Sequence, residues 1–152
     1  MLNLKAFDSS IVYSIKAKKM YSSLGYHRYV PYMTHNIAIA LDSLKRYKEA
    51  QKLYKEVELQ YETDKNLYEL ASTKLGFAKN LYTVKDFNQS KEKAEECLVL
   101  SKNQGFKEFE LKAYKMLSKA YASLGFYKKA FEFSEKHDKY KDSLFEESKT
   151  KI

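Results

Sequence analysis

The sequence predicts an all-α protein, a solenoid of about seven antiparallel helices. Helix breakers are scarce, with four glycines and one proline in 152 residues, whereas helix-favouring Lys, Glu, Leu and Ala are abundant. Apolar residues make up 44% of the chain and recur at three- and four-residue steps, as in Leu117, Tyr121 and Leu124, which places them on one face of a helix. This pattern returns every 40 residues. An all-β sandwich or barrel is excluded, because strands and their turns need more Gly and Pro.

The 40-residue period defines the organisation of the chain. The matching columns are Ala50/Ser90/Ala130, Tyr47/Phe87/Tyr127, Leu44/Val84/Leu124, Leu41/Leu81/Tyr121, Ala38/Ala78/Ser118 and Ile37/Phe77/Leu117. Phe7 and Ser10 fall in the same register, so a partial copy opens the chain. We therefore expect one array over 1–145, made of a partial repeat, 1–25, and repeats at about 26–65, 66–105 and 106–145. A charged tail, 146–152, would start a linker helix.

Each copy is expected to form a helix A and a helix B. The B helices are predicted at 4–23, 46–63, 86–103 and 126–142, and the A helices at 29–44, 67–84 and 107–124. Gly25 and Gly105 follow B helices in the same register, where a left-handed residue closes a helix, and Gly125 closes the last A helix in the same way. Pro31 lies in the first turn of its helix, where its missing N–H costs nothing.

Small residues predict where the two helices of a copy meet. Ala38, Ala78 and Ser118 on the A helices would face Ala50, Ser90 and Ala130 on the B helices. The aromatic column of Tyr47, Phe87 and Tyr127 would fill the space beside this contact. The many Tyr and Phe residues are therefore interpreted mainly as filling between closely packed helices.

A run of residues in the last copy carries a family resemblance. Tyr114, Leu117, Ser118, Tyr121, Gly125, Tyr127 and Ala130 give an aromatic, Leu with a small residue, Tyr, and a Gly-x-Tyr turn leading to Ala. In this order the chain resembles the tetratricopeptide repeat. The earlier copies match less closely, with Lys45 and Lys85 in place of the Gly, and the period exceeds the usual ~34 residues. The resemblance implies a right-handed superhelix whose A helices line a concave surface that binds a protein or peptide.

The 40-residue variant and the tail together imply a setting for the array. The segment 137–147, with its Lys-Asp-Ser-Leu-Phe run, is similar to the end of arrays that precede a coiled-coil or membrane linker in bacterial signalling proteins. We therefore expect a non-catalytic sensor or scaffold region of a larger signal-transduction protein. Two alternatives stay open: a fragment of a peptide-pheromone-sensing regulator, and a basic nucleic-acid-associating protein. No signal peptide is expected, so the region would be cytoplasmic if Met1 is the native start, and extracytoplasmic if it belongs to a membrane sensor.

The family frame names candidate residues on the concave surface. They are Tyr32, His35, Asn36 and Ile39 in the first full copy, Ser72, Leu75, Gly76, Lys79 and Tyr82 in the second, and Lys112, Lys115, Met116 and Lys119 in the third. Lys79, Lys112, Lys115 and Lys119 form a basic stripe that would attract an acidic partner. A solvated lysine face is the alternative interpretation of the same stripe. Tyr32 and Tyr82 could stack on apolar side chains of a peptide, while Asn36 or Asn80 could bond its backbone.

The remaining chemistry-bearing residues predict no enzyme, no cofactor and no metal site. The three histidines, His27, His35 and His137, include no pair at metal-ligand spacing on one helix, and the single Cys97 is expected in the core. Half of the excess in the net charge of +8 lies in residues 1–40, but the charge is less sharply clustered than a nucleic-acid binder would need. No apolar run is long enough for a membrane span. The first helix lacks a paired A helix, so Tyr13, Ile15 and Met20 should expose an apolar patch that favours self-association.

Overall fold

The structure, a computed structural model, describes the backbone of residues 4–151 and the side chains of residues 7–151. Within this part of the chain there are seven α-helices and no strand. The helices are α1 (Leu4–Ser23), α2 (Val30–Ser43), α3 (Tyr47–Thr63), α4 (Leu67–Thr83), α5 (Phe87–Gln104), α6 (Lys107–Ser123) and α7 (Tyr127–Thr150), and a short 3-10 turn, η1 (His27–Tyr29), precedes α2. The predicted all-α class is confirmed, and helix starts and ends lie close to the predicted ones, α7 excepted.

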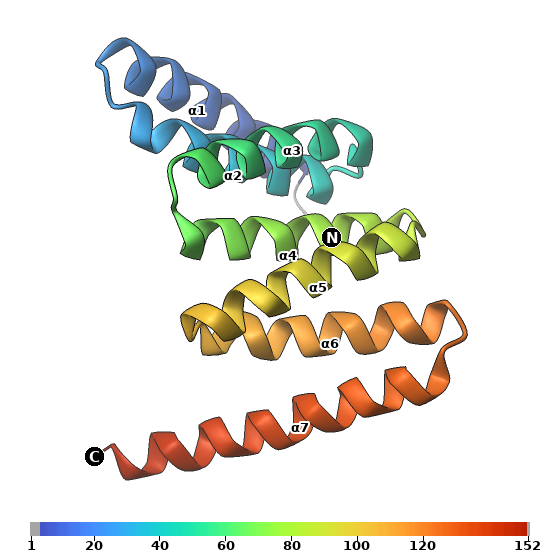
Figure 1. Cartoon of the computed structure of the whole chain (residues 1–152). Helices are drawn as coiled ribbons and strands as arrows, with labels where there is room; N and C mark the ends of the chain where they lie inside the picture. The colour runs from blue at the N-terminus through green and yellow to red at the C-terminus, as the bar shows by residue number, and fades with distance from the viewer. Residues whose placement is uncertain (1–3, 152) are drawn as a thin grey trace.

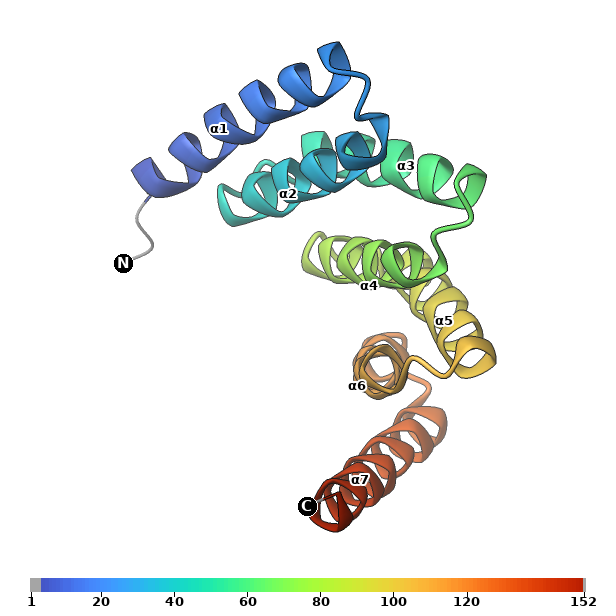
Figure 2. The ribbon, with the colours of Figure 1, turned by 90° about the vertical axis from the view of Figure 1, so that its left-hand side faces the viewer.

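The helices stack in chain order as antiparallel neighbours (Figure 1). Each packs on the next, and α2, α4 and α6 also contact one another in sequence. Seen from the side, the stack curves, with α2, α4 and α6 on the inner side of the curve and α3 and α5 on the outer side (Figure 2). The result is the helix-pair solenoid that the 40-residue period predicts.

The inter-helix turns repeat every 20 residues, which is half of the sequence period. One residue with positive φ closes each turn, and these are Gly25, Lys45, Lys65, Lys85, Gly105 and Gly125. In the turn after α2, Arg46 N donates to Leu41 O at 2.9 Å and Lys45 N donates to Asp42 O at 2.9 Å, which is the Schellman pattern. The three glycines were predicted at this position. The three lysines adopt the same conformation without glycine's freedom.

The small-residue columns meet at the contact between A and B helices, as predicted. Ala38, Ala50, Ala78 and Ser90 are completely buried. In the second copy Ser90 Oγ on α5 donates to Ala78 O on α4 at 2.7 Å. In the third copy the hydroxyl comes from the other helix, because Ser118 Oγ on α6 donates to Ala130 O on α7 at 2.9 Å. Each contact therefore also satisfies the hydroxyl that it buries.

Aromatic side chains fill part of the core beside these contacts, whereas several others are exposed. The rings of Tyr54 and Phe77 stack at 5.5 Å, and Phe87 lies 5.2 Å from Tyr82 on the neighbouring helix. Tyr127 was predicted to fill the equivalent space in the last copy, but 73% of it is exposed. Ala122 stands in the column of Tyr82, so Tyr127 lacks the aromatic neighbour that Phe87 has.

The last helix is longer than predicted. α7 runs to Thr150 instead of ending at 142, so most of the predicted tail is helical. The Lys107 Nζ–Glu147 Oε2 ion pair at 2.7 Å holds this extension on α6, and the edge-to-face contact of Tyr140 with Tyr114 lies just before it. No Gly or Pro interrupts the sequence from 126 to 150, so nothing local stops the helix.

Candidate functional site

The candidate site is the inner face of the curve, formed by the exposed sides of α2, α4 and α6 (Figure 2). Its main feature is the lysine cluster, which we define as Lys79 on α4 with Lys112, Lys115 and Lys119 on α6. The three α6 lysines share one helix face, because they are three and four residues apart. All four are exposed.

The four ammonium groups are close enough to affect one another. Partial burial lowers the pKa of Lys79, and the positive charges of Lys112, Lys119 and Lys115 lower it further. The predicted basic stripe is therefore brought together across two helices. Like charges gathered in this way gain by the approach of an anion.

The lysines of the cluster differ in their neighbouring side chains. Lys112 Nζ pairs with Glu108 Oε1 at 2.6 Å across one exposed helical turn. Lys119 Nζ lies 4.9 Å above the ring of Tyr82, whose hydroxyl is 3.1 Å from Ser123 Oγ. Among the described residues, neither Lys79 nor Lys115 has a carboxylate within ion-pair distance. One acidic side chain thus balances one of four positive charges, and the cluster keeps a net positive charge.

The first copy contributes uncharged side chains to the same face. Tyr32 and Ile39 on α2 are exposed by 47% each, and Asn36 between them is half-buried. Tyr82 on α4 is half-buried beneath Lys119. These four residues give the face apolar contact surface at one end and positive charge at the other.

His35 and Leu75 do not line this face, contrary to the prediction. His35 is 6% exposed and Leu75 is 4% exposed. His35 packs edge-on against Tyr54 and lies beside Gly76 of α4, whereas Leu75 belongs to the core cluster that includes Met116 of α6. The next A helix covers each of them: α4 covers His35, and α6 covers Leu75. Lys115 stands in the same column but is exposed, because no further A helix follows α6 in the described chain.

Four other residues expected at the surface are also less accessible than predicted. Met116 is buried in the core, and Gly76 is half-buried with its Cα facing Tyr54 and His35. Asn80 is 2% exposed. Its amide is fully used inside the protein, donating to Asp42 Oδ1 and to Tyr47 O and accepting from Gln51 Nε2 at 2.9 Å. Both of its N–H donors are used, and its burial keeps it from a peptide backbone. Ser72 is half-buried.

A polar network around Asp42 was not predicted. The Asp42 carboxylate accepts from Tyr54 Oη at 2.7 Å and from Asn80, which ties α2 to α3 and α4. Burial raises the pKa of Asp42, and the two hydrogen bonds act in the opposite direction. Burial also raises the pKa of Tyr54 far above its usual value. These groups fix three helices together.

A buried charge network joins α3, α4 and α5. Lys74 Nζ lies 2.6 Å from Glu96 Oε2 and 3.5 Å from Glu58 Oε1, and Lys93 Nζ lies 2.9 Å from Glu58 Oε2. The side chains of Lys74 and Glu58 are each only 9% exposed. This network was not predicted, because its pairs between helices join residues that are 16 to 35 positions apart in the sequence. Its role is to connect consecutive copies, since each buried charge has a partner of opposite sign.

No protein-family model matches the chain, and no curated protein matches it. The site is therefore characterised by its geometry. None of the described helices is both long enough and apolar enough to cross a membrane. Among the described residues, no group of three His, Cys, Asp or Glu side chains is arranged to hold a metal ion. Cys97 is buried as predicted, and burial raises the pKa of its thiol to about 11.

Proposed function

We propose that this chain is a non-catalytic, tetratricopeptide-like module that binds an acidic segment of a protein or peptide on its inner face. The lysine cluster carries the proposal, because Lys79, Lys112, Lys115 and Lys119 come from two helices and share one open surface. Glu108 alone offsets part of that charge. Surface charges of one sign raise the local concentration of ligands of the other sign and speed their association.

The uncharged part of the inner face supports a peptide as the ligand. Tyr32 and Ile39 offer exposed apolar contact, and the half-buried Asn36 lies between them on the same face. A peptide that lies across α2, α4 and α6 would place acidic residues on the lysines and apolar side chains on Tyr32 and Ile39. Recognition of this kind combines charge for orientation with a few apolar anchors for affinity.

The array would serve as the sensor or scaffold region of a larger bacterial signal-transduction protein. Two observations support this context. One is the similarity of the segment 137–147 to the ends of arrays that precede an output module. The other is the length of α7, which has 24 residues where α3 and α5 have 17 and 18. A helix that extends beyond its repeat is consistent with the start of a linker.

Fluorescence anisotropy with a fluorescein-labelled poly-Glu peptide tests the binding proposal. Lys115→Glu combined with Lys119→Glu should weaken binding roughly tenfold, since reversing two exposed charges removes on the order of 1.4 kcal/mol. The matched control is Lys48→Glu with Lys52→Glu, which makes the same charge change at the same spacing on exposed positions of α3. That control should bind like the wild type.

Equal weakening by both double variants would mean that net charge alone is responsible, and the proposed site would be wrong. A labelled oligo-dT strand provides the second comparison. Oligo-dT binding as tight as that of the peptide, lost on the same Lys115 and Lys119 reversal, would replace the peptide proposal with a nucleic-acid surface.

A further inference from the structure

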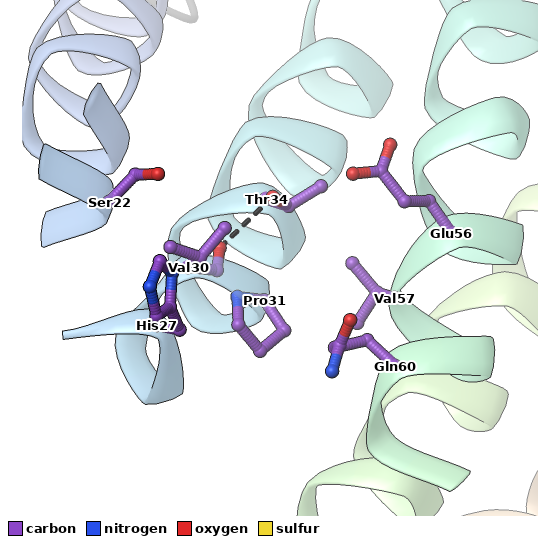
Figure 3. A pocket seen from close by; sticks show the side chains of 8 residues that line it. All are labelled: Ser22, His27, Val30, Pro31, Thr34, Glu56, Val57 and Gln60. Carbon is purple, nitrogen blue, oxygen red and sulfur yellow. Dashed lines mark hydrogen bonds between the residues drawn. The ribbon is translucent and has the colours of Figure 1, made fainter. Parts of the chain in front are cut away.

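A cavity of about 160 Å³ opens between the end of α1, η1, α2 and α3. Figure 3 shows Ser22 and His27 on one side of it and Glu56, Val57 and Gln60 on the other. Pro31, Thr34 and Val57 are buried and form its walls with the half-buried Val30, whereas Ser22, His27, Glu56 and Gln60 are exposed at its rim. It shares no residue with the lysine cluster.

The internal repeat explains why this space is open. Thr34 stands in the column of Lys74 and Tyr114, two long side chains that are buried in the second and third copies. Thr34 is shorter, and its hydroxyl is turned back onto its own helix, donating to Val30 O at 3.0 Å. The first copy therefore lacks the side chain that occupies the equivalent place in the other two.

The two residues that occupy this place share a chemistry. Each has an apolar body and ends in a hydrogen-bond donor that reaches a carboxylate. Lys74 Nζ donates to Glu96 Oε2 at 2.6 Å, and Tyr114 Oη donates to Glu110 Oε1 at 3.0 Å. The first copy keeps the carboxylate that Lys74 reaches, because Glu56 stands in the column of Glu96 and lines the cavity. Glu110, which Tyr114 reaches, stands in the column of Val30.

The charge around Glu56 favours a neutral donor over a second cation. Lys18 Nζ already lies 3.5 Å from Glu56 Oε1, in a pair that is partly exposed on both sides. An added ammonium group would be repelled by Lys18, whereas a phenol hydroxyl would not. The size also fits, because a benzene ring occupies an apolar cavity of about 150 Å³ in a protein.

We propose that this cavity binds a phenol group, with the ring between Pro31 and Val57 and the hydroxyl donating to the Glu56 carboxylate. The phenol could belong to a tyrosine side chain of a partner or to a free small molecule. This site is independent of the proposed inner face, so either can fail without the other.

Titration with p-cresol, followed in ¹H–¹⁵N spectra, tests the site. Saturable shifts are expected at residues 30–34 and 56–60, and toluene, which has the same shape but no donor, should bind about tenfold more weakly. N-acetyl-tyrosinamide distinguishes the sources. Binding as tight as that of p-cresol identifies a tyrosine side chain, and absence of binding identifies a free phenol. Shifts that do not saturate, or equal binding of p-cresol and toluene, would overturn the proposal.

Three variants locate the binding. Thr34→Lys places the second copy's residue in the cavity and should remove binding of both ligands. Thr63→Lys makes the same change at an exposed position one turn beyond Gln60 and should leave both unchanged. Glu56→Gln alters only an exposed side chain and should reduce the preference for p-cresol over toluene several-fold. If circular dichroism shows that Thr34→Lys does not fold, the test rests on Glu56→Gln. An unchanged preference of Glu56→Gln for p-cresol over toluene would reject the role of the carboxylate.

Discussion

Three lysines close helices in a backbone conformation that normally favours glycine. Lys45, Lys65 and Lys85 have φ values of 61°, 55° and 66°. The left-handed region costs a residue with a side chain roughly 1–2 kcal/mol. Hydrogen bonds of the turn hold this conformation nonetheless, because Lys65 N donates to Glu62 O and Asn66 N donates to Tyr61 O. At these positions the chain accepts local strain in exchange for satisfied carbonyl groups at the helix ends.

Lys65→Gly should therefore stabilise the protein. Removing the side chain relieves the left-handed strain, and the free energy of unfolding should rise by about 0.5–1 kcal/mol, net of the greater freedom of glycine in the unfolded chain. Urea denaturation at neutral pH measures this. The control Lys55→Gly, at an exposed position inside α3, should lower the free energy of unfolding by about 1 kcal/mol. A lower denaturation midpoint for Lys65→Gly would contradict the prediction.

His35 gives the protein a sensitivity to acid. Burial lowers its pKa from 6.5 to about 4, so the folded state holds the imidazole neutral. In the unfolded chain the same group takes up a proton at a higher pH. The stability that His35 contributes is thus complete above pH 6.5 and is lost as the pH falls from 6.5 to about 4, by roughly 3 kcal/mol.

The variant His35→Gln isolates this contribution. Between neutral pH and about pH 4.5, the wild type should lose more free energy of unfolding than the variant does, because only the wild type has a buried imidazole to protonate. Denaturation curves at the two pH values provide the comparison. A His35 ring resonance that titrates near its ordinary pKa in the folded protein would refute the explanation.

The contact between the two helices of a copy depends on small side chains that leave no spare volume. Ala130 on α7 is 7% exposed, and its carbonyl accepts the hydroxyl of Ser118 on α6 at 2.9 Å. The equivalent contact in the second copy uses the same two residue types on opposite helices, Ser90 on α5 and Ala78 on α4. The geometry of the contact is therefore retained while the hydroxyl changes sides.

Ala130→Leu should overpack this contact. Three added carbons between helices already in contact force side chains out of their preferred conformations, at a cost of roughly 1–3 kcal/mol, so the melting temperature should fall. Lys128→Leu, an exposed position on the same helix, is the control for added apolar surface and should melt close to the wild type. An unchanged melting temperature for Ala130→Leu would show that the helices can move apart freely.

Periodicity predicted the helices well and their neighbours less well. The spacing of apolar residues and of Gly25, Gly105 and Gly125 defined the element order, because both depend on local geometry. The exposure of a residue on an A helix depends on which helix packs against it in the stack. His35 and Lys115 share a column, yet α4 covers the first and nothing described covers the second. The cavity beside Thr34 was not predicted, because one shorter side chain in a column does not disturb the periodic pattern.

The two ends of the stack differ in what they expose. On α1, Ala17 stands in the column of Val57 and Cys97, which are buried in the later copies. Around it Tyr13 is 72% exposed and Met20 is 53% exposed, as predicted. On α7 the outward positions include Glu135, Asp138 and Asp142, all exposed. The α7 end also exposes apolar side chains, since Phe131 is 64% and Phe145 is 59% exposed, but they are interspersed with these charged residues. We therefore expect association through α1, where it removes apolar surface from water.

Self-association through α1 should therefore appear in sedimentation velocity as a coefficient that rises with protein concentration. Tyr13→Glu combined with Met20→Glu places two charges in the apolar patch and should abolish the rise, because a buried unpaired carboxylate is strongly unfavourable. Phe131→Glu is the matched control: it removes an aromatic side chain that is 64% exposed, but at the α7 end, and should leave the concentration dependence intact. A wild-type protein that sediments as a monomer at every concentration would contradict the prediction. Loss of association with Phe131→Glu would instead move the contact to α7.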